Sequence, residues 1–140
     1  MEAIDDIQNG IIEEFSAFDD WMDKYQLLID LGSSLPALED SCKTDGNLID
    51  GCQSRVWLHA EMEDGKVMFR ADSDAIITKG LIGLLIRVWS GQTPEDILAS
   101  NLYFIDAIGL GGHLSPTRSN GLLSMVKQMR YYALAFSAKP

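Results

Sequence analysis

The stretch Val56-Trp57-Leu58-His59-Ala60-Glu61-Met62-Glu63-Asp64-Gly65-Lys66-Val67-Met68-Phe69-Arg70-Ala71 predicts a β-hairpin in the middle of the chain. Apolar and polar residues alternate around Asp64-Gly65, a dipeptide preferred in two-residue type I′ turns. Closing the strands at this turn places apolar residues opposite one another, in the pairs Met62–Val67, Ala60–Phe69 and Leu58–Ala71. One face of both strands is then apolar in a single register, and we expect it to face a core.

Two amphipathic helices are predicted before the hairpin. Apolar residues recur at helical spacing from Ile4 to Phe18 and again from Trp21 to Leu28, with a capping signal at Asp19-Asp20 between them. Gly32-Ser33-Ser34 ends the second helix. The residues from Glu39 to Asp50 are polar and rich in turn formers, so they predict a surface loop.

Further helices are predicted after the hairpin. Residues Asp72 to Asp74 can cap a helix over residues 76–89, whose apolar residues leave little polar face, so this helix should be central. A short helix begins at Thr93-Pro94-Glu95, and residues 102–108 form a further short turn. Ser115-Pro116 begins the last helix, with proline in its first turn. Its predicted buried residues are Leu122, Val126, Met129, Ala133 and Phe136.

These elements predict one α+β domain over residues 1–140. Helices before and after a small antiparallel sheet give a two-layer arrangement. With 140 residues and 46% hydrophobic content, the chain can form one good core and is too short for two ordinary domains.

Composition excludes several classes of function. The net charge of −10 argues against nucleic acid, which requires clustered Lys and Arg, and favours either a protein partner with basic patches or simple solubility. The first residues carry no targeting pattern, and the apolar run from Leu81 to Ile86 is far too short for a membrane span, so we expect a cytoplasmic protein. Two cysteines in such a chain indicate reduced thiols, with a regulatory Cys42–Cys52 bridge as a minor alternative.

Cys52 is the residue to which the sequence draws most attention. It follows Gly51 on the polar loop and stands just before the first strand of the hairpin. A thiol held at the mouth of a strand by a flexible glycine can be presented to a partner, whereas a structural cysteine normally lies among apolar neighbours. Taken alone, the Gly-Cys pair favours the plainer interpretation, a small buried core residue.

Five ordered sequence blocks extend this interpretation over almost the whole chain. The chain resembles the SufE family of bacterial sulfur-acceptor proteins. The matching blocks are Trp21 with Lys24-Tyr25; Ile29-Asp30-Leu31-Gly32 with Leu35-Pro36; Gly51-Cys52-Gln53-Ser54 with Val56-Trp57; Asp72-Ser73-Asp74-Ala75 with Lys79-Gly80-Leu81; and His113-Leu114-Ser115-Pro116-Thr117-Arg118-Ser119 with Gly121-Leu122. Arg55 departs from the pattern, because an uncharged polar residue is expected there.

The resemblance implies a function for Cys52. It would take persulfide sulfur from a SufS-like cysteine desulfurase, stimulate that enzyme, and pass the sulfur toward a downstream iron–sulfur scaffold. Pyridoxal phosphate would belong to the desulfurase, and this chain would need no cofactor. The resemblance also implies a three-stranded sheet similar to that of IscU-like scaffold proteins, with a third strand from around Asn47 to Gly51, and a movable loop that shields the thiol.

Several other residues are candidates for supporting roles. Gly51, Gln53 and Ser54 flank the cysteine in its block, and Gly51 gives the loop freedom. The cations expected to influence the thiol are Arg55, His113 and Arg118, because a nearby positive charge lowers a cysteine pKa. Each has a plainer interpretation: Arg55 solvates a strand edge, His113 satisfies loop carbonyls, and Arg118 forms an ion pair or a docking contact.

Asp72 and Asp74 are first of all predicted helix caps, with a secondary role in positioning the Cys52 loop or contacting the desulfurase. Gly109, Gly111 and Gly112 lack the spacing of a phosphate-binding loop and predict a flexible turn.

Three other functions remain open at this point. A metal or cluster scaffold is disfavoured, because two cysteines and two histidines stand at no zinc-ligand spacing. A cysteine hydrolase would use Cys52 as nucleophile and His113 as base, without a recognisable oxyanion hole. A plain interaction adaptor would need no reactive thiol. The sequence does not decide whether the chain forms a homodimer.

Overall fold

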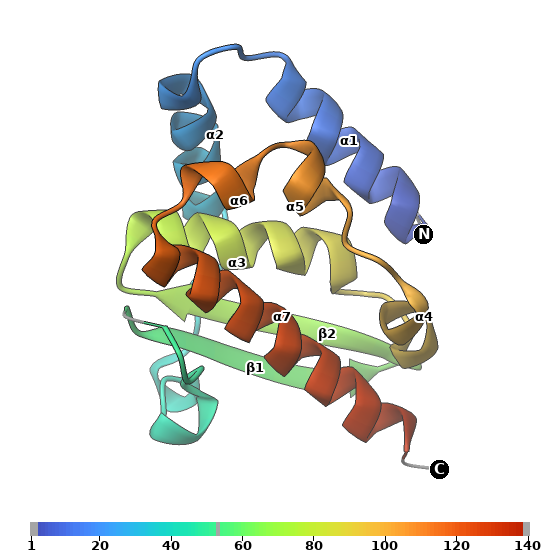
Figure 1. Cartoon of the computed structure of the whole chain (residues 1–140). Coiled ribbons are helices and arrows are strands. Elements are labelled where there is room, and N and C mark those ends of the chain that lie inside the picture. The colour runs from blue at the N-terminus through green and yellow to red at the C-terminus, as the bar shows by residue number, and fades with distance from the viewer. Residues whose placement is uncertain (1–2, 53, 139–140) are drawn as a thin grey trace.

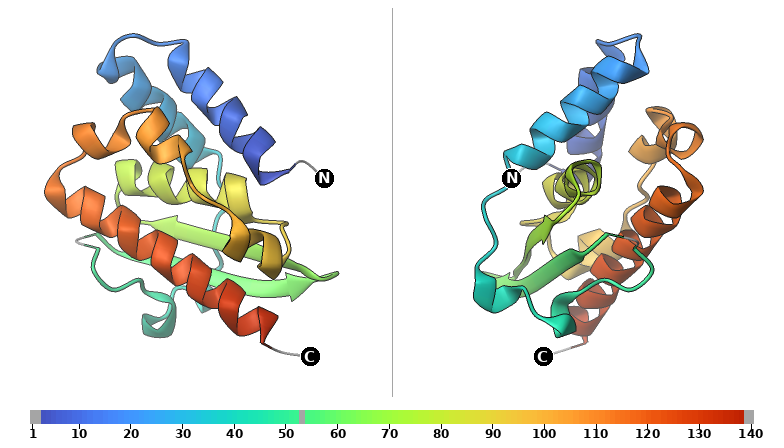
Figure 2. Two further views of the ribbon diagram at one scale, coloured as in Figure 1. Left: turned by 45° about the vertical axis from the view of Figure 1, so that its right-hand side comes forward. Right: turned by 90° about the vertical axis from the view of Figure 1, so that its left-hand side faces the viewer.

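The computed structural model describes residues 3–52 and 54–138, which form an α+β fold (Figure 1). Its helices and strands are α1 (Ile4–Ser16), α2 (Trp21–Ser33), β1 (Val56–Glu63), β2 (Lys66–Ser73), α3 (Ile76–Trp89), α4 (Pro94–Ala99), α5 (Phe104–Ala107), α6 (Leu110–His113) and α7 (Pro116–Ser137), with two 3₁₀ turns, η1 (Asp40–Cys42) and η2 (Asp45–Asn47). Figure 2 shows α3 and α7 beside the hairpin, with α1 and α2 beyond α3.

The hairpin has the predicted register. Its strands pair Met62 with Val67, Ala60 with Phe69 and Leu58 with Ala71. At the turn, Asp64 and Gly65 have φ angles of 52° and 79°, as the left-handed conformations of a type I′ turn require. The buried residues of this face are Val56, Leu58, Val67, Phe69 and Ala71.

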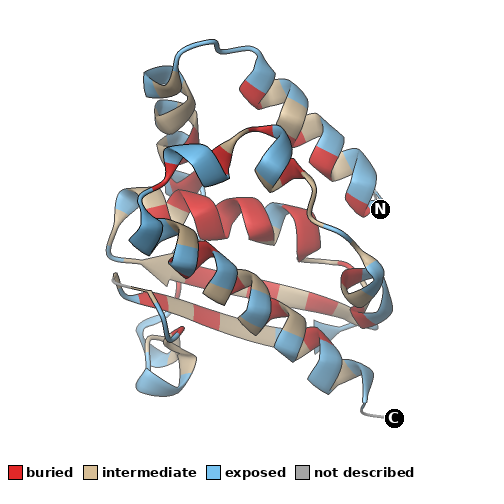
Figure 3. Cartoon of the chain, viewed as in Figure 1, coloured by how far each residue is buried: buried red, intermediate tan, exposed pale blue. Residues whose placement is uncertain are grey.

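Helix α3 is the centre of the core, as its apolar sequence predicts, and Figure 3 shows most of it in the colour of buried residues. Its contact with α2 is unusually close, because two glycines face each other there. A Cβ atom on Gly80 would lie 2.4 Å from the Leu28 carbonyl oxygen, and one on Gly32 would lie 2.7 Å from the Gly80 nitrogen. The two helix backbones therefore meet without an intervening layer of side chains.

The predicted cap of α3 is wrong. The backbone stays extended as far as Ala75, which occupies the N-cap position without a side-chain cap. Asp72 and Asp74 precede the helix, and their carboxylates bind other groups. Ser73 Oγ accepts a hydrogen bond from the Ala75 nitrogen, which lies before the first helical residue. The caps predicted for three other helices are present, since Asp20, Thr93 and Ser115 accept hydrogen bonds from Met22, Asp96 and Arg118 nitrogens.

The expected third strand is absent from the described residues, whose sheet has two strands. The segment before Cys52 contributes one isolated antiparallel bridge, Leu48 to Trp57, and the Ile49 nitrogen donates to the Val56 carbonyl at 2.9 Å. Gly51 then turns the backbone with a φ of 91°, so pairing cannot continue along β1. The likeness to IscU-like scaffolds stays a prediction.

Other boundaries differ in detail. α1 ends at Ser16, two residues before Phe18. Gly111 and Gly112 lie within α6 rather than in a flexible turn, while Gly109 has a φ of 80° at its N-cap. On α7, Leu122, Met129 and Ala133 are buried as predicted, Val126 and Phe136 are half-buried, and Met125 is buried instead. No described helix is both long and apolar enough to cross a membrane.

Candidate functional site

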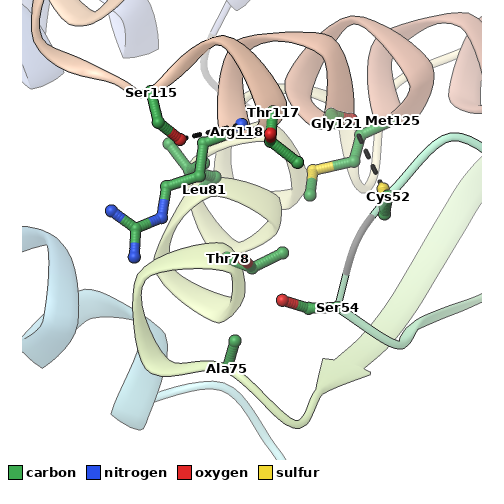
Figure 4. A pocket seen from close by; sticks show the side chains of 10 residues that line it. All are labelled: Cys52, Ser54, Ala75, Thr78, Leu81, Ser115, Thr117, Arg118, Gly121 and Met125. Atoms are coloured by element: carbon green, nitrogen blue, oxygen red, sulfur yellow. Dashed lines mark hydrogen bonds between the residues drawn. The ribbon is translucent and has the colours of Figure 1, made fainter.

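Cys52 lies at the wall of a cavity of about 280 Å³ where three parts of the fold meet (Figure 4). The segment before β1 contributes Cys52 and Ser54, the start of α3 forms one wall, and the first turns of α7 form another. The residues that line the cavity are Cys52, Ser54, Ala75, Thr78, Leu81, Ser115, Thr117, Arg118, Gly121 and Met125. The thiol thus has space beside it in which a second sulfur atom can fit.

The Cys52 thiol is held against α7. Its Sγ lies 3.6 Å from the Gly121 carbonyl oxygen, to which it donates a weak hydrogen bond. A Cβ atom at Gly121 would lie 3.4 Å from Sγ, so glycine leaves the side chain the room it occupies. The thiol is half-buried, and this burial raises its pKa above the ordinary value. In this conformation the thiol is therefore protonated and shielded.

Gly51 is favoured by its backbone conformation, and a close contact with a rotatable side chain of α7 adds a smaller preference. Its φ of 91° lies in the left-handed region that residues with a Cβ adopt at a cost. In addition, a Cβ atom there would fall 2.5 Å from Ser124 Oγ on α7. The residue lets the chain turn closely against α7 immediately before the cysteine.

On the other side of Cys52, Asp74 fixes the segment to the start of α3. Its Oδ1 accepts a hydrogen bond from the Arg55 nitrogen at 3.1 Å, and its own nitrogen donates to the Arg55 carbonyl at 3.3 Å. The predicted positioning role of Asp74 thus has a geometric basis in the Arg55 backbone. The Arg55 residue is exposed at this edge.

Asp72 joins the loop that precedes Cys52 to α3. Its carboxylate lies 3.3 Å from Lys43 Nζ in the loop and 3.3 Å from Lys79 Nζ on α3. Burial alone favours the protonated carboxyl, but the hydrogen bond from the Ser73 nitrogen and the two lysines outweigh it and lower the pKa of Asp72. Lys43 Nζ also lies 5.6 Å from the centre of the Trp57 ring.

Arg118 and His113, the other two cations predicted to influence the thiol, lie in different parts of the fold. Arg118 lines the cavity, but its guanidinium extends away from Cys52 in Figure 4, and it forms no ion pair with any residue that the structure describes. The ion pair predicted for Arg118 is thus absent among the described residues, and the docking contact stays a prediction.

His113 lies on α6, where its ring stacks on Trp21 with centroids 3.9 Å apart and planes inclined by 13°. Its Nδ1 lies 3.0 Å from the Gly109 carbonyl oxygen, as the plainer interpretation predicts, and its own carbonyl accepts from Tyr25 Oη. His113 is not part of the cavity lining, so the structure does not bring Cys52 and His113 together as a hydrolase pair.

Two other predictions concern residues outside this geometry. Gln53 lies outside the described residues. Cys42, on η1, is a free thiol like Cys52, and its carbonyl accepts a hydrogen bond from Asn47 Nδ2 at 2.7 Å. Within residues 3–52 and 54–138, no group of three or more metal-ligating side chains is present.

Sequence reasoning named Ser54 and Arg118 but missed other residues of the cavity walls. Thr78 and Met125 were assigned to helices without any connection to the cysteine, because only the packing of α3 against α7 brings them to it. Gly121 did stand in a matching block, which is the one signal that could have marked it as a neighbour of Cys52.

The fold and the site define a small α+β protein with one shielded cysteine at the junction of a hairpin and two helices. Residues 9–133 match the family model described as SufE: Fe-S metabolism associated domain. The chain belongs to the SufE family, and its role therefore lies in iron–sulfur metabolism.

Similar proteins agree with this assignment. An uncharacterized SufE-like protein of Synechocystis is 40% identical over 126 residues, which cover 90% of this chain and 79% of that protein. One of Rhizobium etli is 41% identical, covering 86% and 84%. SufE-like protein 1, chloroplastic/mitochondrial, of Arabidopsis thaliana is 38% identical over 92% of this chain and 35% of its own length.

One solved structure supports the fold alone. The solution structure of a hypothetical protein from Thermus thermophilus superimposes with a TM-score of 0.78 at 21% identity, covering 95% of this chain and 97% of the other.

Proposed function

We propose that this protein is an accessory sulfur carrier, in which Cys52 accepts persulfide sulfur from a SufS-like cysteine desulfurase, stimulates that enzyme and passes the sulfur to an iron–sulfur scaffold. The single observation that carries the proposal is the half-buried Cys52 thiol beside a cavity of about 280 Å³. The protein would act in the cytoplasm, and it would need no cofactor of its own.

The proposed reaction needs only one thiol on this chain. The Cys52 thiolate attacks the terminal sulfur of the donor's cysteine persulfide, a new sulfur–sulfur bond forms on Cys52, and the donor's cysteine leaves as a thiolate. A thiol on the next protein repeats the exchange and releases Cys52. No electrons are gained or lost overall.

The shielding of Cys52 suits the storage step of this reaction. A persulfide open to water and oxidants is readily lost, and the cavity offers its terminal sulfur an enclosed place. The raised pKa of the thiol works against attack, since only the thiolate is a nucleophile. The acceptor step therefore requires the Cys52 segment to leave the cavity wall when the donor binds.

The experiment is a transfer assay. The protein is incubated with a cysteine desulfurase and cysteine, and intact mass followed by peptide mapping locates any added sulfur. Sulfur on the Cys52 peptide, together with faster alanine release by the desulfurase, supports the proposal. An unmodified chain that leaves the desulfurase rate unchanged would falsify it.

A further inference from the structure

The charge of this acidic chain is unevenly distributed. All 21 Asp and Glu residues lie within residues 1–106, together with seven of the eleven Lys and Arg residues. Residues 107–140 contain the other four basic residues and no acidic one, so their formal charge is +4 against −14 for the rest. Helix α7 belongs wholly to this basic part. Helix α7 thus carries Arg118, Lys127 and Arg130 and no acidic residue, and the Arg130 guanidinium lies over the Trp89 ring and donates to the Ser100 carbonyl.

An exposed apolar stripe runs along the same helix. Leu123, Tyr131 and Leu134 have exposed fractions of 67%, 63% and 55%, and Lys127 lies exposed between them. Their spacing places them on one face of α7, over roughly 16 Å at a rise of about 1.5 Å per residue. Figure 3 shows exposed positions recurring along this helix. Lys127 forms no ion pair within the described part of the chain.

The stripe borders the segment that leads to Cys52. A groove of about 230 Å³ lies between them and is lined by both, with the residues Leu48, Ile49, Asp50, Ser124, Lys127, Gln128 and Tyr131. Ser124 is also the residue that Gly51 approaches most closely. Asp50 is the acidic residue of this groove, on the side opposite α7. A partner protein that covers the stripe therefore also contacts the backbone beside the Cys52 thiol.

We propose that the α7 stripe, formed by Leu123, Lys127, Tyr131 and Leu134, is a docking surface for the protein that supplies sulfur to Cys52. The inference rests on the proposed function. The complementary surface is apolar at its centre and carries a carboxylate opposite Lys127, since the exposed ammonium of Lys127 favours negative charge. A stable interface buries about 800 Å² per partner, more than one helical stripe supplies, so it extends over the rim of the Cys52 cavity.

A second copy of the chain fits the stripe less well. In a two-fold dimer the stripe would meet its own image, which brings the two Lys127 side chains close to each other, and α7 has no acidic residue to balance them. Like charges directly opposed in an interface are unfavourable. A partner with a carboxylate opposite Lys127 removes this repulsion.

The test compares two variants of the full chain with two matched controls. Leu123→Ser and Lys127→Glu change the stripe. Met22→Ser changes an equally exposed apolar residue on α2, with an exposed fraction of 74%, and Lys66→Glu reverses a charge on β2. Because the stripe residues are exposed, the fold should survive, and circular dichroism verifies this. The affinity of each variant for the desulfurase is measured by titration. Sulfur transfer to each variant is measured at a low and at a saturating concentration of that variant.

Both stripe variants should raise Kd about tenfold, with transfer at saturation unchanged, whereas both controls should bind like the unmodified chain. Lys127→Glu should also reduce the salt dependence of binding, and Lys127→Arg should preserve it. Unchanged Kd in both stripe variants overturns the docking surface and leaves the proposed function intact. A change in self-association without a change in desulfurase binding overturns it in favour of a second copy. A failure of the unmodified chain to bind overturns both proposals.

Discussion

At the scale of single residues, three neighbours determine the position of Cys52. Gly121 leaves space for Sγ, Gly51 allows the preceding turn, and Asp74 binds the Arg55 backbone at the start of α3. The importance of the cysteine could be predicted from its sequence block. Its neighbours on α7 could not, because residues 52 and 121 come together only through tertiary packing.

Cys52→Ser should abolish sulfur acceptance and desulfurase stimulation while leaving the fold intact, because serine is nearly isosteric but cannot carry a persulfide. Cys42→Ser is the matched control and should retain both activities, since Cys42 lies outside the lining of the cavity. Intact mass and the alanine release rate measure the two effects. Equal losses in the two variants would point to a dithiol mechanism instead.

The pH dependence of Cys52 alkylation should reflect its burial. Because burial raises the pKa of the thiol, the rate in the folded protein should rise with pH through a midpoint above that of the urea-unfolded chain. The raised pKa also means that its contribution to stability is present below the unfolded value of about 8.5 and lost as pH rises past it. Alkylation of a Cys42→Ser chain measures the midpoint, and coincident folded and unfolded midpoints would contradict the assignment.

At the scale of elements, the features set by neighbouring residues could be predicted from the sequence, and those set by distant residues could not. The hairpin was predictable because turn residues and alternating apolar residues specify its register within one short stretch. The cap of α3 was not, since Asp74 binds the Arg55 backbone, 19 residues away in sequence, and the chain stays extended to Ala75. The predicted third strand does not form for a similar reason, because the turn at Gly51 limits its pairing with β1 to one bridge.

Gly51→Ala should destabilise the turn before Cys52 by about 1–3 kcal/mol, the usual range for backbone strain at a constrained site. The positive φ is the main cause, because the Ser124 hydroxyl, which a Cβ atom would approach, can rotate away. Gly111→Ala is the control, because a Cβ there meets nothing within 4 Å and alanine favours helix. Urea unfolding measures the difference. Equal stability of the two variants would argue against the strained turn.

Asp74→Ala should loosen the Cys52 segment, because the Arg55 nitrogen loses its acceptor. We expect alkylation of Cys52 to accelerate about threefold to tenfold, the range for loss of one such hydrogen bond, and hydrogen exchange around residues 47–52 to increase. Asp74→Asn retains an acceptor oxygen and should restore the slow rate. Fast alkylation in Asp74→Asn as well would assign the effect to charge rather than to the hydrogen bond.

At the scale of the whole molecule, the sequence predicted the α+β class and a central α3, since both follow from composition and periodicity. The cavity is a property of the assembled fold and was not predicted. Nor was the close crossing of α2 and α3, although both glycines stand in matching blocks. Local sequence rules treat a glycine within a helix as destabilising. Here the glycines permit direct contact between the backbones of two helices.

The purified protein should bind no stoichiometric zinc or iron. Its two cysteines and two histidines are not brought together, since the described residues contain no group of three or more metal-ligating side chains, and scattered surface carboxylates hold such ions weakly. Elemental analysis of the protein purified without chelators tests this. A tightly held metal that disappears in Cys52→Ser would favour the scaffold function over the sulfur carrier.

The position of Trp57 gives the molecule an optical signal of its own. Its ring faces the Lys43 ammonium, and its backbone bridges to Leu48, so its surroundings include the segment that leads to Cys52. The other two tryptophans report on different places, since Trp21 stacks on His113 and Trp89 donates to Ser100. Detachment of the segment would expose the Trp57 ring to water and shift its emission to longer wavelength. The opening that the thiol requires can thus be followed in real time, without a label, by fluorescence in a stopped-flow cell.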